Sequence, residues 1–257
     1  MPVADIAEKK RALDAARPVP AVAVRTLADW FEQELTVAAV AVERAGLSRD
    51  DVLGVLARGK PSRTLPQGAQ KLALNHKQAL ELQARLSYPQ NGFTSERTVC
   101  AFHSVLYQGI DEAPGKYRDG PPDDDDGAPD PAKLRVSMSA LSGWLRRCDG
   151  GVDSAWEAHL RIMRIRPFNQ GNAAVALLVT NTMLNRAGFP PIIVGEDVIE
   201  EYEQAILRAK IADDRMAFRH LAVELLDRSL DLCLAGTAHA DGLADRGAHD
   251  LFGGYES

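Results

Sequence analysis

The sequence predicts an all-α protein, and three observations carry that prediction. Apolar residues recur at intervals of three and four along most of the chain, as they do on the buried face of a helix. No stretch of useful length alternates apolar and polar residues, and the sequence lacks the βαβ rhythm of a parallel sheet. The 257 residues, 46% of them hydrophobic and 26% charged, are enough to bury a core.

The N-terminal part of the chain predicts two helices and a loop. The first helix is expected from Thr26 to Val42 and the second from Ser48 onward. Thr26 and Ser48 each stand three residues before an aspartate, which is the spacing of a capping box. Gly46 is expected to end the first helix. Glycines and prolines between residues 58 and 68 predict a connecting loop.

The remaining helices follow in series up to Leu232. They are expected near residues 69–86, 95–107 and 133–148, before Arg166, from Ala173 to Gly188, and around residues 198–209 and 218–232. The helix that starts at Ala173 is apolar on nearly every face, so it should lie at the centre of the fold.

Residues 108–132 are rich in glycine, proline and aspartate. We expect them to form a loop that includes a short β-hairpin around Gly115–Pro122. The run Asp123–Asp126 could hold a cation, but four adjacent carboxylates in such a loop are more typical of a solvated surface.

Composition and charge argue against several classes of protein. A net charge of −6 and a pI of about 5.6 argue against nucleic acid as a partner, since a general binder of phosphate backbones is basic. No apolar run reaches the roughly 18–20 residues that span a bilayer, and Met1–Lys10 has no apolar signal segment. Cys100, Cys148 and Cys233 have no metal-binding spacing and are expected to be reduced thiols. We therefore expect a cytoplasmic protein that does not bind membranes.

The most informative segment is 166–177, which reads RPFNQGNAAVAL. Gly171 and Asn172 stand at the expected start of the central helix. A helix N-terminus offers unpaired N–H groups and the positive end of the helix dipole. The segment therefore predicts a pocket for an anion, in which Arg166 is either a second anion-binding group or a structural arginine.

This segment resembles the motif of the Fic (Fido) family, H-P-F-x-[D/E]-G-N-G-R-x-x-R, which is set between two central helices. The resemblance extends over about Thr26–Leu232. The outer segments that resemble the family are His76, His103, Ala113–Arg118, which looks like the start of the target-docking flap, Asn185–Pro191 and Tyr202–Asp213. The resemblance implies a Fic-like helical bundle with its core at residues 69–235, an N-terminal helical extension at 1–68 and a flexible tail at 236–257.

Members of this family mostly transfer AMP from ATP to a hydroxyl group of a target. In them the motif histidine accepts the hydroxyl proton, the acidic residue holds Mg²⁺, and the two arginines hold the distal phosphates. Here Arg166 replaces the histidine, Gln170 the acidic residue, and Ala174 and Leu177 the two arginines. Arginine has no lone pair that could accept a proton, and a neutral amide binds Mg²⁺ weakly. We therefore expect no ordinary AMP transfer, no metal site and no use of Mg-ATP.

Glu43 resembles the glutamate of an inhibitory motif, [S/T]-x-x-x-E-[G/N], that many members carry on a helix. Ala39 and Arg44 depart from that motif, and Leu177 replaces the arginine with which the glutamate would pair. Glu43 is therefore either a remnant of an inhibitory helix or a solvated helix residue.

Three functional hypotheses follow. The leading one is a binding or regulatory protein whose helix-start pocket takes a small anionic ligand or a protein partner. The second is an enzyme with repurposed chemistry on a small anionic substrate in the same pocket, with Arg166 as anchor. The acid–base candidates for that enzyme are His103, Tyr117 and Glu43. The third is residual AMP transfer. The residues expected to contact a ligand are Lys116, Arg118, Arg166, Phe168, Asn169, Gln170, Gly171 and Asn172; assembly into a homodimer is left open.

Overall fold

Ten α-helices and one short 3₁₀ helix make up the secondary structure of the described residues, which are 3–88, 93–121 and 128–238 of this computed structural model. These elements are α1 Val3–Ala15, α2 Ala21–Val42, α3 Arg49–Arg58, α4 Gln67–Leu86, α5 Glu96–Leu106, α6 Pro131–Leu145, α7 Val152–Ile165, α8 Asn172–Arg186, η2 Glu196–Val198, α9 Ile199–Ile211 and α10 Met216–Ala238. No strand occurs among these residues, so the predicted all-α class is confirmed.

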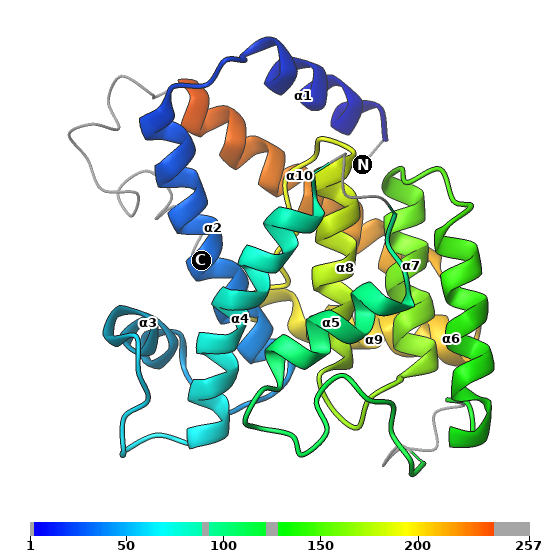
Figure 1. Cartoon of the computed structure of the whole chain (residues 1–257). Helices are drawn as coiled ribbons and strands as arrows, with labels where there is room; N and C mark the ends of the chain where they lie inside the picture. Colours follow the sequence, from blue (N-terminus) through cyan, green and yellow to red (C-terminus); the bar gives the residue numbers. More distant parts are fainter. Residues whose placement is uncertain (1–2, 89–92, 122–127, 239–257) are drawn as a thin grey trace.

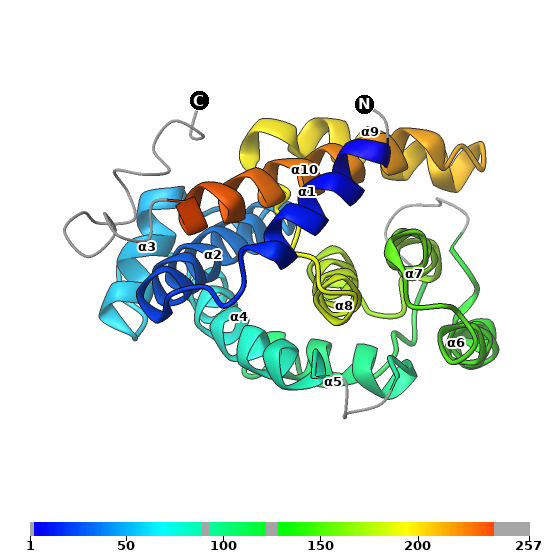
Figure 2. The ribbon, with the colours of Figure 1, turned by 90° about the horizontal axis from the view of Figure 1, so that it is seen from above.

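Helix α8 is the centre of the fold, as its apolar sequence predicts. Figure 2 shows it end-on, with α7 on one side, α4 and α5 on another, and α1, α9 and α10 on a third. Every residue from Ala174 to Leu184 is buried. The buried amide of Asn181 is satisfied by the chain after the helix, because it donates to the carbonyl of Ile192 and accepts from the N–H of the same residue.

Helix α2 joins the N-terminal part of the chain to the centre. It packs against α4, α8 and α10 (Figure 1). It begins at Ala21, so the predicted start at Thr26 is wrong: the Thr26 hydroxyl lies inside the helix and donates to the Val22 carbonyl. The capping box at Ser48 is confirmed, with Asp51 as its partner. Helix α2 ends at Val42, so it stops before Gly46, the residue that was expected to end it.

The expected hairpin around Gly115–Pro122 is not formed over residues 115–121, which are turns and bends. Their backbone N–H groups bond to other parts of the chain: Gly115 donates to His103 of α5, and Arg118 donates to the loop between α7 and α8. The Arg118 N–H donates to the Pro167 carbonyl at 2.9 Å, so a strand partner is not needed. Pro122 and the Asp123–Asp126 run lie outside the described residues.

The C-terminal helix reaches further than the sequence suggests. Helix α10 continues to Ala238, so the first residues of the expected flexible tail are helical. At Gly236 a β-carbon would lie 2.9 Å from a methyl group of Leu27, which shows how closely α10 approaches α2. Residues 239–257 lie outside the described part of the chain. Within that part, none of the helices is both long and apolar enough to cross a bilayer.

Candidate functional site

The loop that joins α7 to α8 carries the predicted motif. Helix α7 ends at Ile165, and Arg166 follows in a left-handed conformation, with φ 45°. Phe168 is buried, and Asn172 holds it in place: its amide donates to the Phe168 carbonyl at 2.8 Å and its oxygen accepts from the Phe168 N–H at 3.1 Å. The motif residues that this sequence retains therefore fix the shape of the loop.

Gly171 is required at the start of α8 by a close contact. Its φ is 81°, and a β-carbon at this position would lie 2.1 Å from the ring of Tyr107. No side chain fits there without moving the tyrosine, and the positive φ alone also disfavours one. Tyr107 was not identified from the sequence, although it lies one helical turn after His103 and so shares its face of α5.

Glu43 occupies the N-terminus of α8. One carboxylate oxygen accepts the N–H of Gly171 at 2.9 Å, and the other accepts the N–H of Ala174 at 2.9 Å. The Tyr107 hydroxyl donates to the first oxygen at 3.3 Å. Burial raises the pKa of the Glu43 carboxyl above its usual range, while the N–H donors act in the opposite direction. The alternative of a solvated helix residue is therefore wrong.

His103 is buried, and the backbone uses both of its ring nitrogens. Nδ1 accepts the N–H of Gly115 at 2.8 Å, which places the ring proton on Nε2, and Nε2 then donates to the Gln170 carbonyl at 3.2 Å. The ring stacks on Phe168 with centroids 3.8 Å apart. Burial lowers the pKa of His103 to about 4, so the ring is neutral near pH 7 and has no lone pair open to a substrate.

The flap residues differ in exposure. Lys116 is exposed, whereas Arg118 is buried and donates to the carbonyl oxygens of Arg166, Gly120 and Pro129. Tyr117 donates its hydroxyl proton to Glu96, and burial raises the pKa of the phenol. These bonds tie the flap to α5 and to the motif loop.

The remaining ligand candidates lie on the outer side of the same loop. The side chains of Asn169 and Gln170 are exposed, and Arg166 is half-buried. The structure thus gathers Glu43, His103 and Gly171 around Tyr107, with Phe168 stacked on His103. The Tyr117 ring lies 6.3 Å from that of Phe168, and Lys116 is exposed. Among the described residues, no group of three or more histidine, cysteine or acidic side chains is arranged to hold a metal ion.

The arrangement can hold an oxyanion, and in this structure the oxyanion is the chain's own carboxylate. Backbone N–H groups at a helix start stabilise negative charge. The two side chains of the cluster that could accept a proton, His103 and Glu43, both accept backbone N–H groups here.

Comparisons with known proteins agree with the motif. Residues 93–184 match the Fic/DOC family. A protein adenylyltransferase Fic of Culex quinquefasciatus is 34% identical over 114 residues, which are 43% of this chain and 23% of that protein. A protein of the same name from Nematostella vectensis is 33% identical over 113 residues, 42% of this chain and 26% of that protein. The chain thus matches about a quarter of the length of these curated relatives.

Solved structures share the fold over nearly the whole chain. A Fic-domain-containing signaling protein of Bacteroides thetaiotaomicron superimposes with a TM-score of 0.81 at 19% identity, over 91% of this chain and 98% of that one. Fic-1 of C. elegans, residues 134–508, superimposes with a TM-score of 0.78 at 18% identity, over 92% of this chain and 72% of that one. At these identities the likeness concerns the fold alone.

Proposed function

The chain belongs to the Fic/DOC family, and from this premise we propose that it is a binding or regulatory protein that does not carry out AMP transfer. Its ligand would be an oxyanion, either a small molecule or an acidic group of a partner protein, that replaces Glu43 at the N-terminus of α8. The observation that carries the proposal is the Glu43 carboxylate on the N–H groups of Gly171 and Ala174.

The first support is the lack of a proton acceptor at the motif position. Arg166 stands where the family motif has histidine, and a guanidinium does not accept a proton in the physiological range. His103, the nearest alternative, uses its acceptor nitrogen for the Gly115 N–H. Loss of a positioned general base typically costs about 10²–10⁴ in rate.

The second support concerns the nucleotide and its metal. The residues present do not fit a magnesium-bound triphosphate, because the Glu43 carboxylate lies where the helix start would receive phosphate. Gln170 offers a neutral amide in place of a carboxylate, and Ala174 and Leu177 offer no cation for the distal phosphates. A negatively charged phosphate at this helix start and the half-buried Glu43 carboxylate would repel each other.

The third support is that the site is otherwise complete and rigid. Tyr107 packs against Gly171, and Asn172 holds Phe168 by two hydrogen bonds. A ligand would therefore replace one side chain without rebuilding the loop. The release of Glu43 from α8 would in turn free the C-terminal end of α2, which offers a means of signalling that the ligand has bound.

The test separates anion binding from AMP transfer. We would measure binding of inorganic phosphate, ADP and Mg-ATP by calorimetry, and label transfer from α-labelled ATP, for the wild type and for Glu43→Gly. Removal of the carboxylate should strengthen phosphate binding by about tenfold or more, since about 1.4 kcal/mol of competition would be removed. Neither protein should transfer the label, because neither has a base.

The matched control is Arg44→Gly, which changes the neighbouring residue in the turn after α2 without touching α8. Arg44 forms an exposed ion pair with Glu203. Phosphate binding should stay at the wild-type level in this variant. Label transfer by the wild type or by Glu43→Gly would overturn the proposal, as would phosphate binding that does not respond to the loss of Glu43.

The names of the relatives favour a second candidate, protein adenylyltransferase activity. In that case Glu43 would act as a brake on a working enzyme, and Glu43→Gly would transfer AMP. A double variant with Arg166→His as well tests whether only the base is missing. Activity in the double variant alone would support the proposal, because it would show that the present chain retains the scaffold but not the chemistry.

A further inference from the structure

A cleft of about 350 Å³ lies apart from the start of α8, between α6, α7, α9 and the loop that joins α9 to α10. Pockets that bind small molecules in proteins typically have volumes of about 300–1,000 Å³. The residues of the motif cluster around Tyr107 do not line this cleft. Ile165, the last residue of α7, does line it, so α7 contributes to both regions.

The walls of the cleft are apolar at their base. Leu141 from α6, Leu160 from α7 and Ile206 from α9 line it, together with Ala140 and Ala209. Leu141 and Ile206 belong to the hydrophobic core, so this base is rigid and is not a gap between mobile side chains. Such a surface suits the aliphatic or aromatic body of a ligand.

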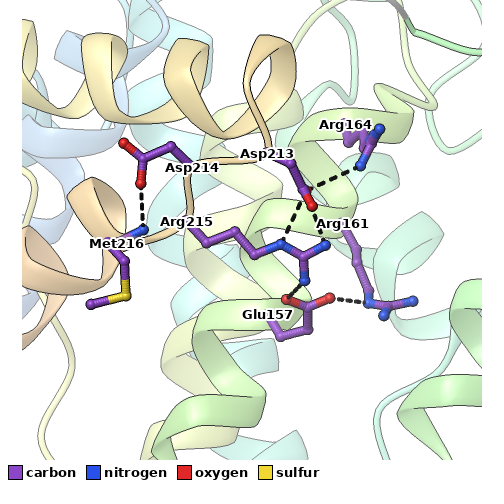
Figure 3. A network of polar contacts seen from close by, with 7 residues as sticks. All are labelled: Glu157, Arg161, Arg164, Asp213, Asp214, Arg215 and Met216. Atoms are coloured by element: carbon purple, nitrogen blue, oxygen red, sulfur yellow. Dashed lines mark hydrogen bonds and ion pairs between the residues drawn. The ribbon is translucent and has the colours of Figure 1, made fainter.

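The rim of the cleft carries more positive than negative charge. Figure 3 shows a network in which three arginines share two carboxylates. Glu157 accepts from Arg161 at 2.6 Å and from Arg215 at 2.8 Å. Asp213 accepts from Arg215 at 3.1 and 3.2 Å.

Arg164 is the arginine of this network with the longest contact. It reaches Asp213 at 3.6 Å, and its side chain is 58% exposed. Both donors of Arg215 and the Arg164 guanidinium reach the same oxygen of Asp213, Oδ1, and the two Arg215 bonds are the shorter contacts. The network would therefore be completed by one more acceptor, and a carboxylate suits the planar fork of an arginine.

We propose that this cleft binds a small amphipathic carboxylate, with its apolar body against Leu160 and Ile206 and its carboxylate on Arg164. The positive charge of the rim favours this occupant over a neutral one, and the cleft volume suits a small molecule. The site does not depend on the function proposed for the start of α8, because it uses other residues and another kind of donor.

The test uses phenylbutyrate and octanoate, each paired with its neutral carboxamide. Saturation-transfer NMR and calorimetry on the full chain should give saturable binding of the carboxylates and binding of the carboxamides that is weaker by about tenfold. Arg164→Gln should weaken carboxylate binding by about the same factor. Ala140→Phe, at an exposed position of α6, should fill the cleft and abolish binding of both classes.

Arg208→Gln is the matched control, since Arg208 is an exposed arginine of α9 that does not line the cleft. Its carboxylate binding should equal that of the wild type. Equal binding of acid and amide, or binding that survives both Arg164→Gln and Ala140→Phe, would overturn the proposal. It would also be overturned if no probe binds, or if the probes bind only after Asp123–Asp126 are replaced by serine, since the chain's own acidic run would then be the anion.

Discussion

The start of α8 and the cleft beside α6 both accept negative charge, but they do so in opposite ways. At α8 the donors are backbone N–H groups, and the acceptor is Glu43, a residue 128 positions away in the same chain. In the cleft the donors are exposed arginines that outnumber their carboxylates (Figure 3). At the start of α8 the donors are already bonded to an acceptor of the same chain, whereas in the cleft the donors outnumber the acceptors. The conspicuous sequence motif therefore marks the region whose donors are already occupied.

The largest effect should come from Gly171→Ala, which tests how tightly the α8 region is packed. The new β-carbon would meet the Tyr107 ring at 2.1 Å in a backbone with positive φ. We expect a loss of about 3 kcal/mol or more in the free energy of unfolding, because both overpacking and backbone strain contribute. Urea denaturation followed by circular dichroism measures it.

Gly150→Ala is the control for backbone strain alone. Gly150 also has a positive φ, 72°, but nothing lies within 4 Å of its virtual β-carbon. The free energy of unfolding of this variant should fall by only about 1 kcal/mol. Equal losses in the two variants would mean that Tyr107 does not press on Gly171, and that the α8 region is looser than described.

A smaller loss should follow from Glu43→Ala, which leaves two N–H groups of α8 without their acceptor. We expect the free energy of unfolding to fall by about 1–3 kcal/mol, since the lost bonds are charge-assisted and partly buried. Thermal and urea unfolding should agree on the change. An unchanged midpoint would mean that the capping carboxylate contributes no stability, and the contrast with the cleft would disappear.

The pH dependence of stability should arise from the α8 side of the molecule. Burial lowers the pKa of His103 to about 4 and of His76 and His159 to about 3, against 6.5 for a free histidine. Below pH 6.5 the unfolded chain therefore binds more protons than the folded one. The free energy of unfolding should fall with falling pH by at most about 1.4 kcal/mol per pH unit for each of these histidines.

Replacement of His103 by Gln should make this decline shallower between pH 6.5 and 4, whereas His220→Gln, at an exposed position, should not. Urea midpoints across a pH series measure the slopes. No histidine is among the described residues that line the cleft, so its variants should show the wild-type slope. If Arg164→Gln made the dependence of stability on pH shallower, the assignment of that dependence to the buried histidines would be contradicted.

The smallest effect on stability is expected from Arg164→Gln. The guanidinium is mostly exposed and its contact with Asp213 is long, so the free energy of unfolding should change by no more than about 0.5 kcal/mol. The same variant should lose most carboxylate binding. A large loss of stability would show that the cleft arginines hold the fold together and do not await a ligand.

The positions of the helices after α1 could largely be predicted from the sequence because they depend on local spacing, whereas α1 itself was not predicted. The apolar run after Ala173 marked α8 as central, and the Ser48 capping box is formed as expected. The predicted helix start at Thr26 was wrong, because a threonine hydroxyl can cap a helix or donate to a carbonyl inside one, and that of Thr26 donates to the Val22 carbonyl. The predicted flap hairpin is not formed, because Arg118 donates to backbone carbonyls of the motif loop instead of to a strand partner.

By itself the sequence determined which residues stand in segment 166–177, since Arg166, Gln170 and Leu177 are there whatever the fold. Only the tertiary structure decided what lies against that segment: Glu43 contacts α8, and Tyr107 contacts Gly171, through contacts between residues far apart in the chain. It also brought Arg164 of α7 to Asp213, which lies in the loop after α9. Such contacts follow from how helices pack against each other, and no spacing along a single helix encodes that arrangement.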